Sequence, residues 1–294
     1  NDPLVSTSNL DPQTVITWFS SEARALPWRD TSPWGVLVSE FMLQQTPVNR
    51  VLPRWQLWLE RWPTPTELAN CSVAEAIRAW GNLGYPRRAK RLHESATIIV
   101  QQFDGEVPTT YEGLISLPGV GEYTANAVLA FAFGQRSLVL DVNVRRLLAR
   151  AWLGQSHQAP TVSLVERSLA QELLPTSRHQ CAQWSAASME LGALICTARD
   201  PSCSKCPIIN DCKWFAEGKP LSAIPKRSQA RYEGSVRQER GRILKILRDN
   251  EKPVSVSTLS RHAPDNQRFE ISLTQLASEA MITKVGSNYA LPNS

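Results

Sequence analysis

The sequence lacks the features of a membrane, secreted or repetitive protein. Its 294 residues contain no apolar run of eighteen or more, so no segment is predicted to span a membrane. The first residues, NDPLVSTSNLDPQ, lack the positive charge and following apolar stretch of a secretory signal, and neither internal repeats nor low-complexity tracts occur. We therefore expect a cytosolic protein, long enough to form a sizeable core and more than one domain.

Alternating strand patterns are also scarce, and none is convincing before about residue 280. Apolar residues instead recur at intervals of three and four along several stretches, which Pro and Gly interrupt. This period is typical of amphipathic helices, so the predicted fold class is all-α. The stretches are VSEFMLQQTPVNRVLPRWQLWLERW, VAEAIRAWGNLG, RAKRLHESATIIVQQF, YTANAVLAFAFG and VNVRRLLARAWLG.

The end of the chain is basic. Residues 222–294 carry 12 Lys and Arg against 7 Asp and Glu, which accounts for the whole net charge of +5. Residues 221–234 are polar and contain proline, and we expect a linker there. In residues 235–294, three helical patterns precede two strands that turn at Gly286 and Ser287. This is the outline of a winged helix, and its charge suits a phosphate backbone. A small helical cap that only packs is the alternative.

Cysteine is scarce but clustered. Only six cysteines occur, and four stand within residues 196–212 in the spacing C-x6-C-x2-C-x5-C. A reducing compartment keeps thiols free, so these four are predicted to bind metal rather than to form disulfides. Zinc prefers paired C-x2-C knuckles, whereas four thiolates on one compact loop can hold an iron-sulfur cubane. We expect Cys71 and Cys181 to be ordinary buried thiols. The clustered four are Cys196, Cys203, Cys206 and Cys212.

The stretch LPGVGEYTANAVL, residues 117–129, predicts a tight turn that leads directly into a helix. Backbone N–H groups at such a helix start can bind a phosphate oxygen, although a plain connection between two helices has the same pattern. Asp141 follows about twenty residues after the turn, before the helix expected from Val142. We predict that it caps this helix, whose N-terminus favours the ionised carboxylate.

Glu40 stands between apolar residues in the stretch SEFMLQQT. A lone glutamate of this kind is more often a salt-bridged surface residue. However, SEFMLQQT, AWGNLGY, LPGVGEYTAN, LDVNVRR and MELGALICTARDPSCSKCP together resemble the MutY-type adenine DNA glycosylases of the endonuclease III-like, helix-hairpin-helix superfamily. The resemblance runs from about residue 27 to residue 212. The remaining tail is too short for the usual Nudix-like domain and is similar to the short actinobacterial form of these bacterial enzymes.

The resemblance implies a helix-hairpin-helix DNA glycosylase fold. Residues 31–135 would form a six-helix domain with the hairpin, residues 1–30 and 136–220 an iron-sulfur cluster domain, and residues 235–294 the winged-helix-like domain. The four clustered cysteines would hold a [4Fe-4S] cluster with a structural and DNA-docking role. A monovalent cation at the hairpin and a monomeric, nucleoid-associated enzyme are implied as well. The basic residues expected to face phosphates from the cluster loop are Arg199, Lys205 and Lys213.

The resemblance also implies base excision. Breaking an N-glycosidic bond develops positive charge at the sugar, while the leaving base needs a proton. Glu40 would be the acid, since its apolar neighbours favour the neutral form, and Asp141 the electrostatic partner or transient nucleophile. Tyr123 occupies the position at which strand-cutting relatives carry a Schiff-base lysine, so the enzyme is predicted to be monofunctional, and Tyr123 to hydrogen-bond near Asp141. Asn143 matches the pattern of the adenine glycosylases.

A base stacked in a duplex must be flipped out before it reacts. By resemblance, Gln45 is the wedge that fills the vacated space, and Tyr85 presses on the opposite base. The expected substrate is duplex DNA in which adenine lies opposite 8-oxoguanine or guanine. The other residues that the resemblance assigns to DNA or substrate binding are Arg24, Trp28, Arg29, Leu43, Thr46, Gly119, Val120 and Gly121.

Ala186 departs from the family, whose members usually carry Gln or Glu ten residues before the first cluster cysteine. A thymine or uracil mismatch glycosylase of the same superfamily is one alternative. Glu40 argues against it, because a pyrimidine has no equivalent ring nitrogen to protonate. A non-catalytic iron-sulfur redox sensor that binds DNA is the other, and it would not need Glu40, Asp141 and Gln45 together. Without the residue missing at 186, adenine recognition would rest more on Trp28, Arg29, Leu43 and Glu40.

Overall fold

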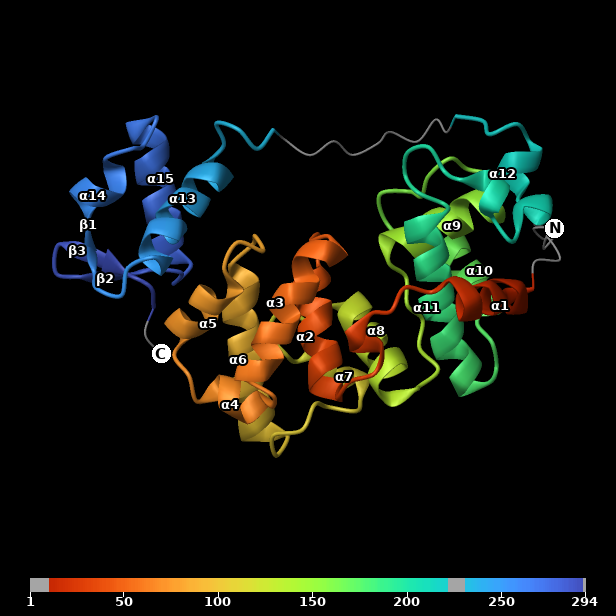
Figure 1. Ribbon diagram of the computed structural model, residues 1–294, viewed down its shortest axis with the longest axis horizontal. Helices are drawn as coiled ribbons and strands as arrows, with labels where there is room; N and C mark the ends of the chain where they lie inside the picture. Colours follow the sequence, from red (N-terminus) through yellow and green to blue (C-terminus); the bar gives the residue numbers. More distant parts are fainter. Residues whose placement is uncertain (1–10, 222–230, 293–294) are drawn as a thin grey trace. The chain divides into compact units, whose positions relative to one another are not determined.

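The computed structural model describes residues 11–221 and 231–292 (Figure 1). Within these ranges the regular secondary structure is helical except for three short strands near the C-terminus. The described residues divide into two compact units, one of residues 11–30 with 121–221 and one of residues 31–120 with 231–292. No helix in the described parts is long and apolar enough to cross a membrane. The prediction of an all-α fold class is confirmed.

The division of the chain differs in two places from the expected one. Helix α8 packs against α11 and belongs to the first unit, although the sequence placed it in the six-helix domain. Residues 231–292 share a unit with residues 31–120, although the sequence placed residues 235–294 in a domain of their own. Most of the expected linker, residues 222–230, lies outside the described residues. The first unit contains α1 (Pro12–Glu22), η1 (Pro27–Arg29), α8 (Glu122–Phe133), α9 (Val142–Ala151), α10 (Leu164–Glu172), α11 (Arg178–Leu194), η2 (Cys203–Lys205), η3 (Ile209–Asp211) and α12 (Lys213–Ala216). The second contains α2 (Pro33–Leu43), α3 (Val48–Arg61), α4 (Pro65–Ala69), α5 (Val73–Trp80), α6 (Arg87–Gln102), α7 (Tyr111–Ile115), α13 (Val236–Arg248), β1 (Val254–Ser255), α14 (Val256–Ser260), α15 (Asn266–Ser278), β2 (Thr283–Val285) and β3 (Asn288–Ala290).

Helix α2 is the most deeply buried element of the second unit. It starts at Pro33, which suits a first helical position, and the Ser32 hydroxyl caps it by accepting from the Gly35 N–H at 3.2 Å. Every residue from 34 to 42 is buried. Because apolar residues surround this helix, a charged side chain on it is held inside the core. This is where Glu40 stands.

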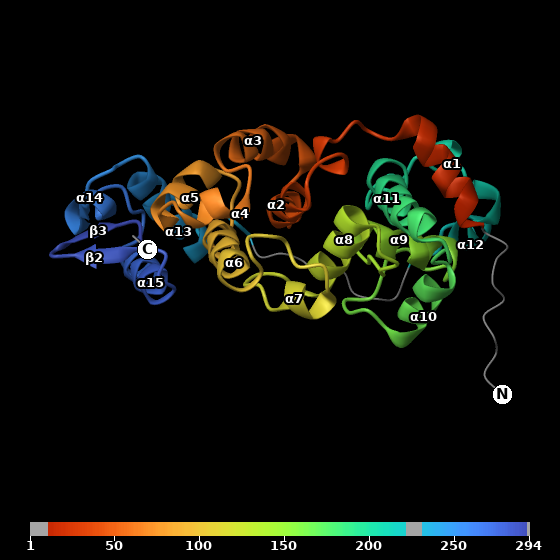
Figure 2. The same cartoon turned by 90° about the horizontal axis from the view of Figure 1, so that it is seen from below.

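The first unit is organised around α9 and α11. Figure 2 shows α1 beside α11 and α11 beside α9, in agreement with the packing of these helices. Trp152 and Trp184 meet edge to face, with ring centroids 6.4 Å apart. Cys181 is fully buried in this core, as predicted, whereas Cys71 in the second unit is only half-buried. The packing fixes the start of α9, where Asp141 lies, against the helix that leads into the cysteine loop.

The C-terminal part of the second unit has three helices and a three-stranded antiparallel sheet in the order β1-β3-β2. The predicted hairpin is confirmed, with its turn at residues 286 and 287, and Gly286 adopts a left-handed φ of 61° there. The expectation of no strand before about residue 280 is wrong, because Val254 and Ser255 pair with β3. Two residues are too few to show an alternating pattern, so this strand forms only through its partner.

Candidate active site

Glu40 is 6% exposed and lies on α2 between the buried residues Ser39 and Phe41. The helix ends three residues later at Leu43, which is half-buried. A charged side chain is rarely this buried in an apolar segment without a specific use. The prediction that Glu40 is a surface residue, the ordinary alternative, is therefore wrong.

Two turns of the second unit, one after α2 and one before α6, each contain a non-glycine residue in the left-handed region of backbone conformation. Gln45 has φ 54° and Tyr85 has φ 47°. Gln45 is exposed, and Tyr85 is 41% exposed. Such backbone conformations cost on the order of 1–3 kcal/mol each and persist only where the surroundings enforce them. The two residues expected to enter the duplex are thus held in set conformations.

The buried guanidinium of Arg88 connects these two turns. Burial lowers its pKa to about 10, and its charge lies over the Trp80 ring at 5.2 Å and the Tyr85 ring at 5.4 Å. Arg88 donates from Nη1 to the carbonyl oxygens of Phe41 (2.8 Å), Met42 (3.0 Å) and Gln44 (2.6 Å), and from Nη2 to Thr46 Oγ1 (2.9 Å) and the Gly84 carbonyl (3.1 Å). One side chain therefore holds the end of the Glu40 helix, the Gln45 turn and the Tyr85 turn.

The two glycines of the LPGVG turn are not equivalent. Gly119 has φ +87°, and a Cβ there would lie 3.0 Å from Phe41 Cε1 and from Arg91 Cδ. Gly121 caps α8 with φ −106°, and a Cβ there would meet nothing within 4 Å. Val120, between them, is buried. Gly119 is therefore required by the fold, whereas Gly121 leaves open space at the first N–H groups of a helix, as an anion site would need.

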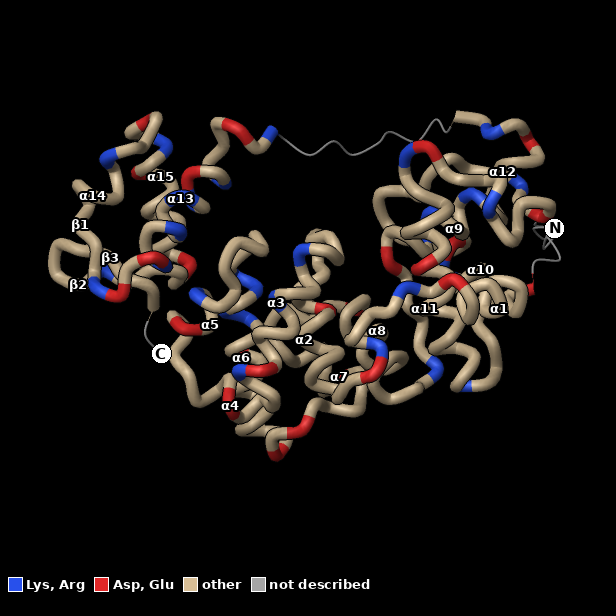
Figure 3. The backbone as a smooth tube through the Cα atoms, viewed as in Figure 1, with Lys and Arg blue, Asp and Glu red and all other residues tan. Residues whose placement is uncertain are grey.

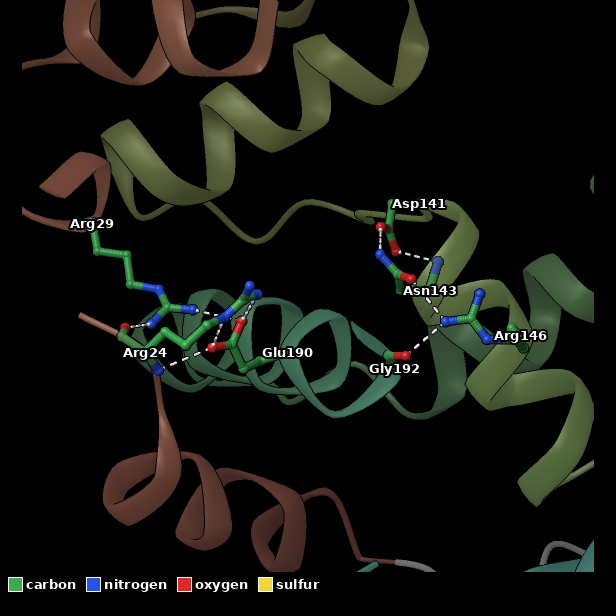
Figure 4. A network of polar contacts seen from close by, with 7 residues as sticks. All are labelled: Arg24, Arg29, Asp141, Asn143, Arg146, Glu190 and Gly192. Carbon is green, nitrogen blue, oxygen red and sulfur yellow. Dashed lines mark hydrogen bonds and ion pairs between the residues drawn. The ribbon is translucent and has the colours of Figure 1, made fainter. Parts of the chain in front are cut away.

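Asp141 caps α9 in the first unit, which confirms that prediction (Figure 4). Its carboxylate accepts from Asn143 N at 2.9 Å, Val144 N at 2.6 Å and Asn143 Nδ2 at 2.7 Å. Burial nevertheless raises the pKa of Asp141, and these hydrogen bonds lower it only in part. The N-terminus of α9 therefore does not by itself determine the charge of the Asp141 carboxyl group, contrary to the expectation from the sequence.

A buried arginine, Arg146, supports the Asp141–Asn143 pair. Its Nη2 donates to Asn143 Oδ1 at 2.7 Å and to the Gly192 carbonyl at 2.6 Å (Figure 4). Its Nε donates to the Cys196 carbonyl at 2.7 Å. Gly192 permits this approach, because a Cβ there would lie 2.7 Å from the Asn143 carbonyl oxygen. The start of α9 is thereby tied to α11 and to the first residue of the cysteine loop.

Glu190 on α11 holds the segment before α2. Arg24 Nε and Nη2 donate to its carboxylate oxygens at 2.9 and 2.7 Å, Arg24 N donates at 2.9 Å, and Arg29 Nη2 lies at 3.1 Å (Figure 4). These bonds offset burial and lower the pKa of Glu190. The guanidinium groups of Arg24 and Arg29 therefore face a protein carboxylate. Trp28 is half-buried between them in η1, and Tyr123 packs beside Ala127 on α8.

The four clustered cysteines surround one small cavity with an otherwise largely apolar lining. Burial raises the pKa of Cys206 to about 12, and the other three thiols act in the same direction. Arg150 donates to Cys196 Sγ at 3.3 Å and to the Thr197 carbonyl at 2.7 Å, and it covers the Trp214 ring at 4.6 Å. In the part of the chain that the structure describes, no three His, Cys, Asp or Glu side chains converge as a single metal ion requires. Four thiols around one cavity supply the number and type of ligands that an iron-sulfur cluster takes.

The chain is similar in sequence to known DNA repair proteins. Residues 38–175 match the HhH-GPD superfamily of base excision DNA repair proteins. Over 289 residues the chain is 46% identical to an adenine DNA glycosylase of Mycobacterium tuberculosis, which covers 97% of this chain and 94% of that protein. The chain belongs to the adenine DNA glycosylases.

Other members of the adenine DNA glycosylases differ in length. The human adenine DNA glycosylase is 40% identical over 211 residues, which are 68% of this chain but 38% of the human protein. Among solved structures, a thermostable thymine-DNA glycosylase gives a TM-score of 0.64 at 27% identity and covers 70% of this chain and 95% of that one. A trapped endonuclease III–DNA covalent intermediate gives a TM-score of 0.61 at 21% identity, with coverage of 71% and 95%, and shows the same fold. The predicted helix-hairpin-helix glycosylase fold is confirmed.

Sequence reasoning missed Arg88, Arg146 and Glu190. Each is a buried charge whose partners lie far away along the chain, and Arg88 stands next to Arg87, which has the same side chain and a different partner. The available signal was weak: Glu190 is the only acid in the small-residue stretch SAASMELGAL. The expected phosphate contacts Arg199, Lys205 and Lys213 are all exposed on or just after the cysteine loop.

Proposed function

We propose that this adenine DNA glycosylase removes adenine opposite 8-oxoguanine or guanine from duplex DNA and leaves the abasic strand uncut. The observation that carries the proposal is the burial of Glu40 in an apolar helix. A carboxyl group shielded from water can stay protonated until a flipped base reaches it, and it can then give its proton to a ring nitrogen. The N-glycosidic bond breaks as that proton moves, and the bonding electron pair leaves with the base.

Asp141 serves the sugar in this proposal. As the base departs, positive charge develops at the anomeric carbon, and a carboxylate there stabilises it or bonds to it transiently before water replaces the base. The hydrogen bonds from Asn143 and Val144 hold the Asp141 carboxylate in one orientation. Strand cutting through an imine with the sugar would need an amine at position 123. Tyr123 has a phenol there, and a phenol cannot form an imine. Strand cutting by that route is therefore not expected.

Gln45 and Tyr85 are proposed to hold the duplex open. Both are exposed at turns with left-handed backbone, and Arg88 holds both turns. Trp28, Leu43 and Thr46 are proposed to line the path of the base, and the backbone N–H groups of the turn from Gly119 to Gly121 are proposed to bind a phosphate. Arg24 and Arg29 are proposed to act indirectly, because Glu190 engages both guanidinium groups.

We further propose that the four cysteines hold a [4Fe-4S] cluster. Their arrangement around a cavity suits it, and the Arg150 guanidinium donates a hydrogen bond to Cys196 Sγ at 3.3 Å. When bound, the cluster supplies a covalent cross-link of the loop, so Arg199, Lys205 and Lys213 are presented to phosphates in fixed positions. A monovalent cation at the hairpin and a monomer acting at the bacterial nucleoid remain predictions within this proposal.

A second candidate is excision of thymine or uracil from mismatches, because a thymine-DNA glycosylase shares the fold at 27% identity. Single-turnover assays with duplexes that pair adenine, thymine or uracil with guanine, and adenine with 8-oxoguanine, separate the two. We expect excision of adenine only, with the fastest rate opposite 8-oxoguanine. Excision of thymine or uracil at a comparable rate would replace the proposal with its alternative, and DNA binding without excision would favour the redox sensor.

A further inference from the structure

The second unit contains a strongly basic groove between α13 and the Gly84–Tyr85 turn, here called the α13 groove. Its lining contains nine basic side chains and no aspartate or glutamate. Basic positions along α13 are marked blue in Figure 3. The lining also includes Gln45 and Tyr85. The basic residues are Arg50, Arg87, Arg88 and Arg91 from the helical core, and Arg237, Arg240, Arg242, Lys245 and Arg248 from α13.

Ion pairs hold the two walls of the α13 groove together. Glu279, at the end of α15, pairs with both Arg87 and Arg240, and its carbonyl accepts from Lys90 Nζ at 3.1 Å. These arginines lower the pKa of Glu279 to about 2, so it is ionised at neutral pH. The Arg78 side chain donates to the Asn250 carbonyl at 3.4 Å on the same side of the unit. The groove is therefore built by the fold of this unit.

Two α13 residues, Lys245 and Arg237, line the α13 groove away from Glu279's ion pairs. The Lys245 side chain is 71% exposed and pairs with the exposed Asp249 at 2.9 Å. Because an exposed ion pair contributes little to stability, a phosphate can compete with Asp249 for Lys245. Arg237 lies over the ring of the exposed Tyr232 at 5.2 Å.

The third helix of the C-terminal part, α15, has far fewer basic residues than α13. In the helix-turn-helix arrangement this helix enters the major groove of DNA. Its only basic residue is Arg268, which lies 3.6 Å from Asp265, whereas the acidic Glu270 and the apolar Ile271 are exposed. With one arginine and an exposed glutamate, this surface attracts phosphates weakly, and Asp265 competes with a guanine for Arg268.

We infer that the C-terminal domain binds duplex DNA through the α13 groove, and that α15 does not act as a recognition helix. The inference rests on the proposed action on duplex DNA and specifies the surface. Because Gln45 and Tyr85 line the same groove, the phosphates that α13 binds lie beside the base pair that these two residues open. The contact is to the backbone, so it adds affinity without reading sequence.

Two double charge reversals with equal net-charge change test this inference. The α13 variant is Arg237→Glu with Lys245→Glu, and the control, on the surface that a recognition helix and wing would use, is Arg268→Glu with Lys284→Glu. Binding of a 25-base-pair duplex is measured at several salt concentrations, with melting temperature as the fold check. Each phosphate contact contributes about 0.9 to the slope of log K against log salt. We expect the α13 variant to lose about 1.8 of slope and on the order of 50-fold in affinity at 0.1 M salt, and the control to change by less than threefold.

Equal losses in both variants, or a larger loss in the control, would overturn the inference. Its failure is distinct from failure of the proposed function. If wild-type protein excises no adenine but only the α13 variant loses binding, the function is wrong and the α13 groove stands. If excision is confirmed and the control loses binding instead, the function stands and α15 is the DNA-binding helix.

Discussion

Two buried arginines, one in each unit, hold residues that are predicted to act in base excision. Arg88 holds the turns that carry Gln45 and Tyr85, and Arg146 holds the Asp141–Asn143 pair. Both guanidiniums donate to backbone carbonyls on segments distant in sequence, up to 47 residues away for Arg88. Hydrogen bonds from a charged donor contribute about 1.5–3 kcal/mol each, more than typical neutral ones. Neither arginine is predicted to take part in the reaction, but each holds residues that are.

Replacing Arg88 by lysine tests its positioning role. Lys keeps the charge but lacks the planar fork that reaches five acceptors, so we expect single-turnover excision to slow by about 10-fold or more. Duplex affinity should change less than about threefold, because phosphate contacts supply most of it. Fluorescence of 2-aminopurine next to the target base measures flipping, and Arg61→Lys, at an exposed ion pair with Glu75, is the control. Unchanged flipping in Arg88→Lys, with stability lowered, would mean that Arg88 only supports the fold.

Tyr123 is predicted to be the reason that the strand is left uncut. Because a phenol cannot form an imine, we expect borohydride to trap no covalent adduct between wild-type protein and substrate DNA. Tyr123→Lys places an amine at that position and is expected to gain weak strand cutting. Tyr123→Phe is the control for lost packing. A trapped adduct with the wild type would show that another amine serves the sugar and that the monofunctional assignment is incorrect.

Local interactions were predictable from sequence, and distant ones were not. Asp141 was identified as a helix cap because its partners are its next neighbours, Asn143 and Val144. Arg88 and Glu190 could not be identified from the sequence, because their structural roles depend on which distant segments pack against them. The cysteine spacing predicted a shared site, and the four thiols do line one cavity.

Among the secondary-structure elements, the turn between α7 and α8 allows a matched pair of substitutions. Gly119→Ala puts a methyl group on a left-handed residue and 3.0 Å from Phe41 and Arg91, so we expect a loss of about 1–3 kcal/mol in unfolding free energy. Gly121→Ala meets open space and should cost less than about 1 kcal/mol. Urea denaturation measures both. Similar losses would mean that the turn relaxes around either side chain.

The same elements show where periodicity succeeds and fails. The long helices and the final hairpin follow from apolar spacing and from the turn at Gly286, whereas β1 has two residues and exists only as a partner of β3. From the sequence alone, the two glycines of LPGVG could not be distinguished. Only the packing of Phe41 and Arg91 against residue 119 distinguishes them.

At the scale of the whole molecule, the basic tail is proposed to supply affinity rather than lesion recognition. Deleting residues 232–294 should weaken binding to every duplex similarly and flatten its salt dependence, because phosphate contacts of the α13 groove are lost. The preference for 8-oxoguanine over guanine opposite adenine should change little, since Gln45 and Tyr85 are retained. Single-turnover excision from both duplexes at saturating protein measures this. A selective loss of the 8-oxoguanine preference would assign lesion recognition to the tail.

The assignment of function depends on Glu40 as the acid that protonates adenine. The decisive measurement is single-turnover excision of adenine opposite 8-oxoguanine by wild type and by Glu40→Gln, at protein concentrations that saturate both. Gln keeps the shape of the side chain but has no acidic proton, so we expect the rate to fall by about 10²- to 10⁴-fold or more while duplex affinity stays within a few fold. Excision by Glu40→Gln within tenfold of the wild-type rate would contradict the role of Glu40 and with it the proposed mechanism.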